Sequence, residues 1–139
     1  MQTQTSIVKK LTAPASTAWA AISGIGGLDR WFPIIKSCGV EGNGEGAIRH
    51  LTLEDGGEMI DHIRIIDHDN RLLRYHRVSL PFPVTDYFGT VEIFKSFDQR
   101  AVINWTIQFN VAPEDKEQIL GLIHTAISDG IDGMNAEIS

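Results

Sequence analysis

Two ionisable residues occupy positions where alternation predicts apolar side chains. Arg49 lies within the apolar alternation of the strand expected over Ala47–Leu53, and Asp61 lies in the same way within Glu58–Ile66, with Ile65 on its face. Because the parity of a hairpin is strict, both residues are expected on the buried face, opposite each other or one diagonal step apart. The chemistry is that of a buried ion pair whose guanidinium keeps donors for a further partner.

Further polar side chains reach the inward face by the same parity. Tyr75 and Arg77 belong to one expected strand and Tyr87 to the next. Together with the ion pair they form a polar patch within apolar walls, which is the usual form of a small-molecule site. Two structural alternatives stay open: the ion pair serves only itself, and Arg77, near a strand end, extends to solvent.

Other kinds of chemistry find little support in the residues. His50, His62 and His76 fall on the outward parity, so no metal site is predicted. Ser79 falls on the inward parity, but no histidine shares its face to activate it as a nucleophile. The stretch GNGEG precedes a strand and not a helix, so it predicts a turn and not a phosphate loop. No cofactor is indicated.

Composition limits the class of protein. The chain has 139 residues, of which 42% are hydrophobic, as expected for one domain spanning 1–139. With 12 Lys and Arg against 18 Asp and Glu, the formal net charge is −6, which argues against nucleic acid as a partner. No apolar run is long enough for stable membrane insertion, and Cys38 is the only cysteine. We therefore expect a cytoplasmic protein.

The helices and strands that position these residues are predicted from the spacing of hydrophobic residues, which changes along the chain. Short helices are expected between Pro14 and Gly24 and within Gly24–Pro33, and a long amphipathic helix after Pro113. Strands are expected over Thr3–Leu11, Ile35–Val40, Ala47–Leu53, Glu58–Ile66, Leu72–Ser79, Asp86–Phe94 and Ala101–Val111. This order predicts an α+β protein in which a curved antiparallel sheet packs on the long helix.

One helix is too narrow to cover the concave face of such a sheet, so a cavity is expected beside it. Ile123 and Ile127 belong to the apolar stripe of the helix, and Trp105 to the inward face of the last strand. Glycines occur within the helix at Gly121, Gly130 and Gly133 and within a strand at Gly89. Glycines there leave room for a hollow, although close backbone packing and local fraying are alternative explanations.

The sequence resembles the polyketide cyclase/dehydrase-like branch of the START-like, Bet v 1-like superfamily, also called SRPBCC. The resemblance rests on GLDRWFPII, GNGEGAIRHLTLEDGGEMIDHIRIIDH, PVTDYFGTVEI and INWTIQF and extends over almost the whole chain. It implies a helix-grip fold, in which a seven-stranded antiparallel sheet wraps around a long C-terminal helix with a ligand cavity between them. The chain has Phe32 where the pattern often has histidine, and Asp61 where it usually has glutamate.

Three functions are compatible with these features. The first is a carrier or binding protein for a small, mainly hydrophobic or aromatic molecule with a carboxylate, carbonyl or phenol end. The second is a cavity enzyme of the polyketide cyclase/dehydrase type, which would need Tyr75, Tyr87 or Asp61 to titrate near neutral pH. The third is an interaction protein with a vestigial cavity. The predicted ligand-binding residues, with Trp31 at the entrance, are Trp31, Arg49, Asp61, Tyr75, Arg77, Tyr87, Trp105, Ile123 and Ile127.

Overall fold

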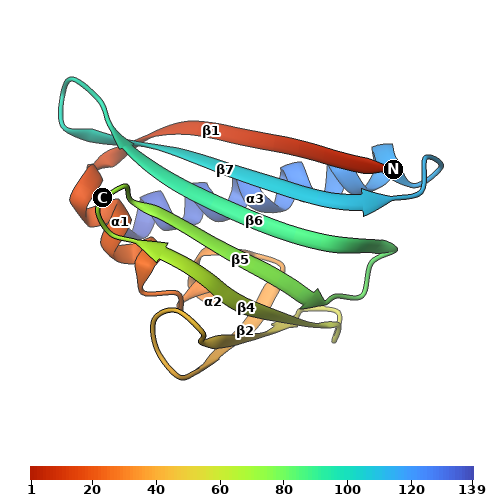
Figure 1. Ribbon diagram of the computed structural model, residues 1–139. Coiled ribbons are helices and arrows are strands. Elements are labelled where there is room, and N and C mark those ends of the chain that lie inside the picture. Colours follow the sequence, from red (N-terminus) through yellow and green to blue (C-terminus); the bar gives the residue numbers. More distant parts are fainter.

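A curved antiparallel sheet of seven strands forms the framework of the protein, shown by a computed structural model that describes residues 1–139 (Figure 1). Along the sheet the strands follow the order β1-β7-β6-β5-β4-β3-β2, so β1 and β2 are its two edges. Their bounds are β1 Gln2–Pro14, β2 Ile35–Glu41, β3 Ile48–Leu53, β4 Glu58–Asp67, β5 Leu72–Ser79, β6 Val84–Lys95 and β7 Arg100–Val111.

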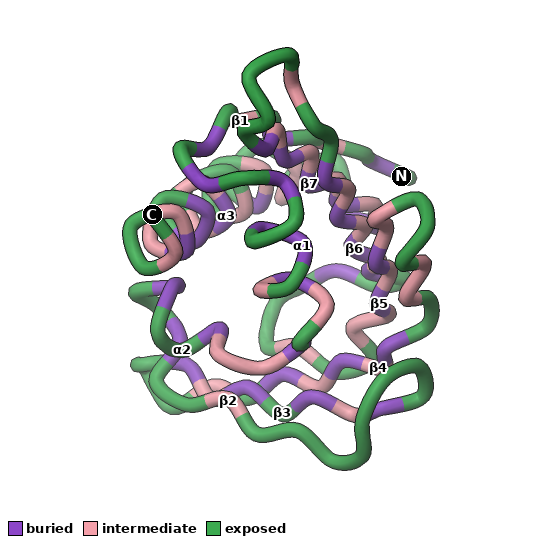
Figure 2. The backbone as a smooth tube through the Cα atoms, turned by 90° about the vertical axis from the view of Figure 1, so that its left-hand side faces the viewer, coloured by how far each residue is buried: buried purple, intermediate pink, exposed green.

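Three helices close the concave side of the sheet. They are α1 Ala15–Ser23, α2 Leu28–Trp31 and α3 Lys116–Ile138. The long helix α3 contacts edge strand β1 and also α2, and α2 contacts the opposite edge strand β2. The helices therefore bridge the gap between the two sheet edges, so that strands and helices together surround the core (Figure 2). None of the three helices is both long and apolar enough to span a membrane.

This architecture confirms the predicted helix-grip fold. The clearest alternation is in β7, where every second residue from Ala101 to Val111 is buried and those between are only partly covered. A single cluster of 32 buried hydrophobic residues joins the inner face of the sheet to the helices. The period-two pattern in the strands and the helical stripe in α3 thus face each other across the core.

Strict alternation is wrong at two predicted inward positions. Ile65 is 40% exposed and Ser79 is also exposed. The register between β4 and β5 shifts between Ile63 and Ile65 and again between Ile60 and Asp61. Each irregularity changes the residue count on one strand, so the side chains beyond it turn to the other face.

Candidate ligand-binding cavity

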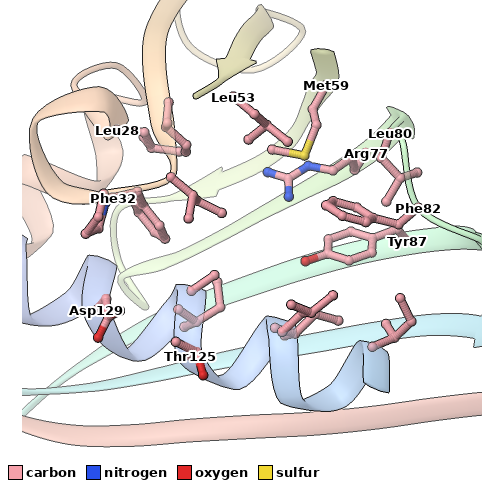
Figure 3. A pocket seen from close by; sticks show the side chains of 18 of the residues that line it. Leu28, Phe32, Leu53, Met59, Arg77, Leu80, Phe82, Tyr87, Thr125 and Asp129 are labelled. Carbon is pink, nitrogen blue, oxygen red and sulfur yellow. The ribbon is translucent and has the colours of Figure 1, made fainter. Parts of the chain in front are cut away.

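A cavity of about 480 Å³ lies between α3 and the concave face of the sheet (Figure 3). Of its 23 lining residues 17 are hydrophobic, so most of its wall offers only apolar contact. α3 supplies one side of the wall, strands β2 to β7 supply the other, and α2 adds Leu28. Apart from two tyrosines and the residues at the mouth, the large apolar and aromatic lining residues are Leu28, Phe32, Ile35, Leu53, Met59, Leu80, Val84, Trp105, Ile119, Ile123 and Ile127.

The exposed lining residues mark the mouth of the cavity. Ile34, Phe82 and Leu122 all line the cavity and are all exposed, although they are large hydrophobic residues. They come from the loop before β2, the loop between β5 and β6, and α3. The exposed acidic lining residues are Glu54, Asp55 and Asp129. The mouth therefore combines an apolar rim with negative charge.

The carboxylate of Asp61 lies between two arginine side chains. Arg49 donates from Nε and Nη2 to Asp61 Oδ2 at 3.0 and 2.8 Å. Arg77 donates from Nε to Oδ1 at 2.7 Å and from Nη2 to Oδ2 at 3.1 Å. Asp61 is the direct register partner of Arg49 on β3 and of Arg77 on β5, so three neighbouring strands place the three groups side by side.

This triad is buried and carries an excess positive charge. The side chains of Arg49, Asp61 and Arg77 are 4%, 0% and 10% exposed. Burial opposes ionisation of Asp61, but the attraction of Arg77 and Arg49 outweighs it and holds the pKa of the carboxyl below its usual range. Two guanidinium groups and one carboxylate leave a net charge of about +1 in the interior.

The two arginines face different surroundings. Arg49 also donates from Nη1 to the carbonyl oxygen of Ile25 at 3.0 Å, and it does not line the cavity. Arg77 does line the cavity, and its Nη1 donates no hydrogen bond to the protein. Figure 3 shows the Arg77 guanidinium and the Tyr87 hydroxyl reaching into the same space. Arg77 is therefore the cation that a molecule in the cavity would meet.

Two tyrosines surround the cavity-facing guanidinium. The Arg77 Cζ lies 5.3 Å from the ring centre of Tyr75 and 5.1 Å from that of Tyr87. Trp105 Nε1 donates to the Tyr75 hydroxyl at 3.2 Å, so that hydroxyl keeps its own proton to donate. Burial raises the pKa of Tyr75 and also, together with its neighbour Tyr75, the pKa of Tyr87. Both phenols remain neutral hydrogen-bond donors at neutral pH.

The predicted site residues separate into two groups. Six of them line the cavity: Tyr75, Arg77, Tyr87, Trp105, Ile123 and Ile127. Trp31, Arg49 and Asp61 do not. Trp31 is buried and its Nε1 donates to Glu137 at 3.0 Å, whereas Arg49 and Asp61 lie behind the wall that Tyr75 forms.

Sequence reasoning did not select several residues of the wall and rim. Phe32 packs edge to face on Trp105, with ring centres 5.7 Å apart, and Met59 lies in the wall near Arg77 (Figure 3). Met59 lies two residues before Asp61 in the same strand, so the alternation that places Asp61 inward was the available signal. Phe82 lies in a loop that the sequence indicates only as a turn, and no periodicity there shows that it reaches the mouth.

The carboxylates that line the cavity lie at its mouth and not at its inner end. None of its lining residues is a histidine, cysteine, serine or lysine. No group of three or more His, Cys, Asp or Glu side chains is placed to hold a metal ion. The polar groups at its inner end are thus a fixed cation and two neutral phenols, which can orient and neutralise a ligand.

Comparison with known protein families matches residues 2–138 to the family described as polyketide cyclase/dehydrase and lipid transport. The chain belongs to this family. The match includes every strand and helix and the whole cavity wall. Comparison with curated proteins found no match.

Solved structures of this family's fold resemble the chain over nearly its full length. Protein XoxI from Bacillus cereus is 24% identical with a TM-score of 0.86, and the match covers 97% of this chain and 94% of that one. Zhui aromatase/cyclase from a Streptomyces species is 15% identical with a TM-score of 0.86, covering 99% and 94%. Norcoclaurine synthase from Thalictrum flavum is 20% identical with a TM-score of 0.82, covering 99% and 87%. At these identities the likeness shows the fold, and a shared fold does not fix a shared function.

Proposed function

We propose that the protein binds a small, mainly hydrophobic molecule with one polar end in its internal cavity, as a carrier or binding protein. The observation that carries this proposal is the cavity itself, whose volume of about 480 Å³ falls within the range of about 300–1,000 Å³ that ligand pockets occupy. Its walls are apolar, and its buried polar groups converge at one end around Arg77. An apolar body and a single polar end match this distribution.

The ionisable groups support binding over acid–base catalysis. The pKa of Asp61 is lowered, whereas burial raises the pKa values of Tyr75 and Tyr87. Each shift moves the group further from neutral pH, while a general acid or base works best with a pKa near the operating pH. These three buried groups are therefore better suited to supply fixed charge and hydrogen-bond donors than to carry protons.

A cyclase or dehydrase activity is the second candidate, and the family match favours it. One solved relative is an aromatase/cyclase, and norcoclaurine synthase has a structure in complex with dopamine and hydroxybenzaldehyde. Donors such as Arg77 and Tyr87 are suited to stabilise a developing oxyanion. This candidate requires the protein to convert a bound aromatic or polyketone compound, which product analysis by mass spectrometry would detect.

Binding is tested with the neutral dye Nile red and a change that fills the cavity. Ala126 lines the cavity from α3, so Ala126→Phe should weaken dye binding by about tenfold or more. Ala136→Phe is the matched control, because Ala136 is exposed on the same helix. Dye affinity that is equal in the two variants and the wild type would contradict the proposed site.

Tryptophan fluorescence gives a second readout of the same site. Trp105 lines the cavity and Trp31 does not. The fluorescence of each tryptophan is obtained as the difference between the wild type and the variant that lacks it, Trp105→Phe or Trp31→Phe. Nile red should quench the fluorescence of Trp105 and leave that of Trp31 unchanged. Native mass spectrometry of the freshly purified protein would then identify the class of any molecule that copurifies.

A further inference from the structure

We propose that the polar end of the ligand is a carboxylate, bound by Arg77 Nη1 together with the hydroxyl groups of Tyr87 and Tyr75. This inference rests on the proposed function, because it names the chemical class of the molecule that the cavity takes. The sequence left three kinds of polar end open, namely a carboxylate, a carbonyl and a phenol. The inference selects the carboxylate.

The first argument is the charge balance of the buried triad. Asp61 accepts hydrogen bonds from both Arg49 and Arg77 and can neutralise only one of them. The side chain of Arg77 is only 10% exposed, so water offsets little of the remaining charge. A buried charge without a partner is unfavourable, and an anion in the cavity would supply that partner.

The second argument is the direction of the available hydrogen bonds. Arg77 uses Nε and Nη2 on Asp61, which leaves the Nη1 edge for the cavity, and a guanidinium has no acceptor. The oxygen of Tyr75 already accepts from Trp105, so its remaining role is to donate. An ionised carboxylate only accepts hydrogen bonds and therefore matches these donors, whereas a phenol would bring a proton of its own.

The third argument is that the cation is held in a fixed orientation. The Arg77 guanidinium lies within cation–π distance of the rings of Tyr75 and Tyr87, and Asp61 holds its other edge. The Tyr87 hydroxyl points into the space that Arg77 also faces (Figure 3). A donor set that is already ordered binds a carboxylate without the entropy cost of ordering a long side chain.

The test compares two ligands of the same shape. 2-Naphthylacetate and 2-naphthylacetamide share an aromatic body and a carbonyl oxygen, but only the first is an anion at pH 7.5. Titration calorimetry should show that the wild type binds the acid at least about tenfold more tightly than the amide, which corresponds to about 1.4 kcal/mol. In Arg77→Met the ratio should fall below about threefold, with little change for the amide.

The chain offers a matched control on the same strand. Arg74 lies on the outer face of β5, where it bonds to Thr90 and Gln108, so Arg74→Met removes the same charge without touching the cavity. Its acid-to-amide ratio should equal that of the wild type. In Arg77→Met the carboxylate of Asp61 keeps Arg49 as partner, which favours folding. Should that variant not fold, Tyr87→Phe is the second test and should lower the ratio about threefold.

The outcomes separate this inference from the proposed function. A wild type that binds Nile red but shows no preference for the acid over the amide overturns the carboxylate assignment alone. The assignment is also overturned if Arg74→Met lowers the ratio as much as Arg77→Met does, because the preference then reflects net charge. Failure to bind Nile red or either naphthyl compound overturns the proposed function, and the inference with it.

Discussion

The ring of Tyr75 occupies the space in which any side chain at Gly89 would lie. The two residues are direct register partners on β5 and β6, and a Cβ at Gly89 would come within 2.1 Å of the Tyr75 ring. Tyr75 forms the wall between the cavity and Arg49, so this contact fixes the inner end of the cavity. A glycine in the middle of a strand, normally unfavourable, is required here by the neighbouring ring.

Gly89→Ala should therefore destabilise the protein by about 1–3 kcal/mol, because the added methyl group overpacks a filled site. The free energy of unfolding, measured by urea denaturation, is the readout. Gly39→Ala is the control, since a Cβ at this strand position meets nothing within 4 Å, and it should change stability by less than about 0.5 kcal/mol. Equal effects at the two glycines would contradict the tight Tyr75 contact.

The Arg49–Asp61–Arg77 triad predicts an unusual order of mutational effects. Arg49→Met combined with Asp61→Leu removes a complete ion pair, but it leaves Arg77 buried without its partner. We expect this double variant to lose roughly 3–5 kcal/mol of stability. Adding Arg77→Met should restore much of that loss, because all three buried polar groups are then replaced by apolar ones. Chemical denaturation of the double and triple variants measures the difference; a triple variant less stable than the double one would contradict the assignment of Arg77.

The pH dependence of stability should report on Asp61. Its pKa is lowered in the folded protein by Arg77 and Arg49 against the opposing effect of burial. The stability that the ionised carboxylate contributes is therefore fully present above its unfolded pKa of about 3.9 and is lost as the pH falls through the lower folded value. Urea denaturation should show a steeper loss below about pH 4 in the wild type than in the triple variant. Parallel curves would mean that Asp61 contributes nothing to the acid response.

The three glycines of α3 should respond differently to alanine. A Cβ at Gly130 would meet the Phe32 ring at 2.2 Å, and one at Gly133 would meet the Trp31 carbonyl oxygen at 2.2 Å, whereas Gly121 faces open space. Gly121→Ala should stabilise the protein by up to about 1 kcal/mol, the difference in helix propensity. Gly130→Ala and Gly133→Ala should destabilise it, as thermal denaturation would show. Stabilisation by all three would indicate that α2 and α3 are not in close contact.

Periodicity was sufficient to predict the α+β layout and the first ion pair, and the resemblance to a known family supplied the helix-grip fold. Alternation in two neighbouring strands placed Arg49 and Asp61 on one face, and the structure makes them direct partners. The same reasoning placed Tyr75, Arg77 and Tyr87 inward, and all three line the cavity. These predictions succeeded because the parity of a hairpin is a local property that short turns preserve.

The roles of the two arginines depend on contacts that alternation does not encode. Arg49 is turned away from the cavity by the Ile25 carbonyl, which comes from the segment between α1 and α2. Arg77 is drawn to Asp61, where sequence reasoning had also allowed it to extend to solvent. Trp31 was expected at the entrance, but the close contact between α2 and Gly133 buries it beneath α3. The positions of Arg49 and Trp31 depend on how loops and helices cross the sheet, and the position of Arg77 depends on the register between β4 and β5, which the periodicity of one strand does not contain.

The acidic mouth and the cationic inner end act in opposite ways on the exchange rate of an anion. A carboxylate passing Glu54, Asp55 and Asp129 on a chain of net charge −6 meets repulsion before it reaches Arg77. Salt screens the exposed mouth far more than the buried triad, so both the association and the dissociation rates of 2-naphthylacetate should rise with ionic strength in stopped-flow experiments. An association rate that falls with salt would contradict this barrier. Because of this electrostatic barrier at the mouth, the time that an anion stays in the cavity depends on ionic strength as well as on affinity.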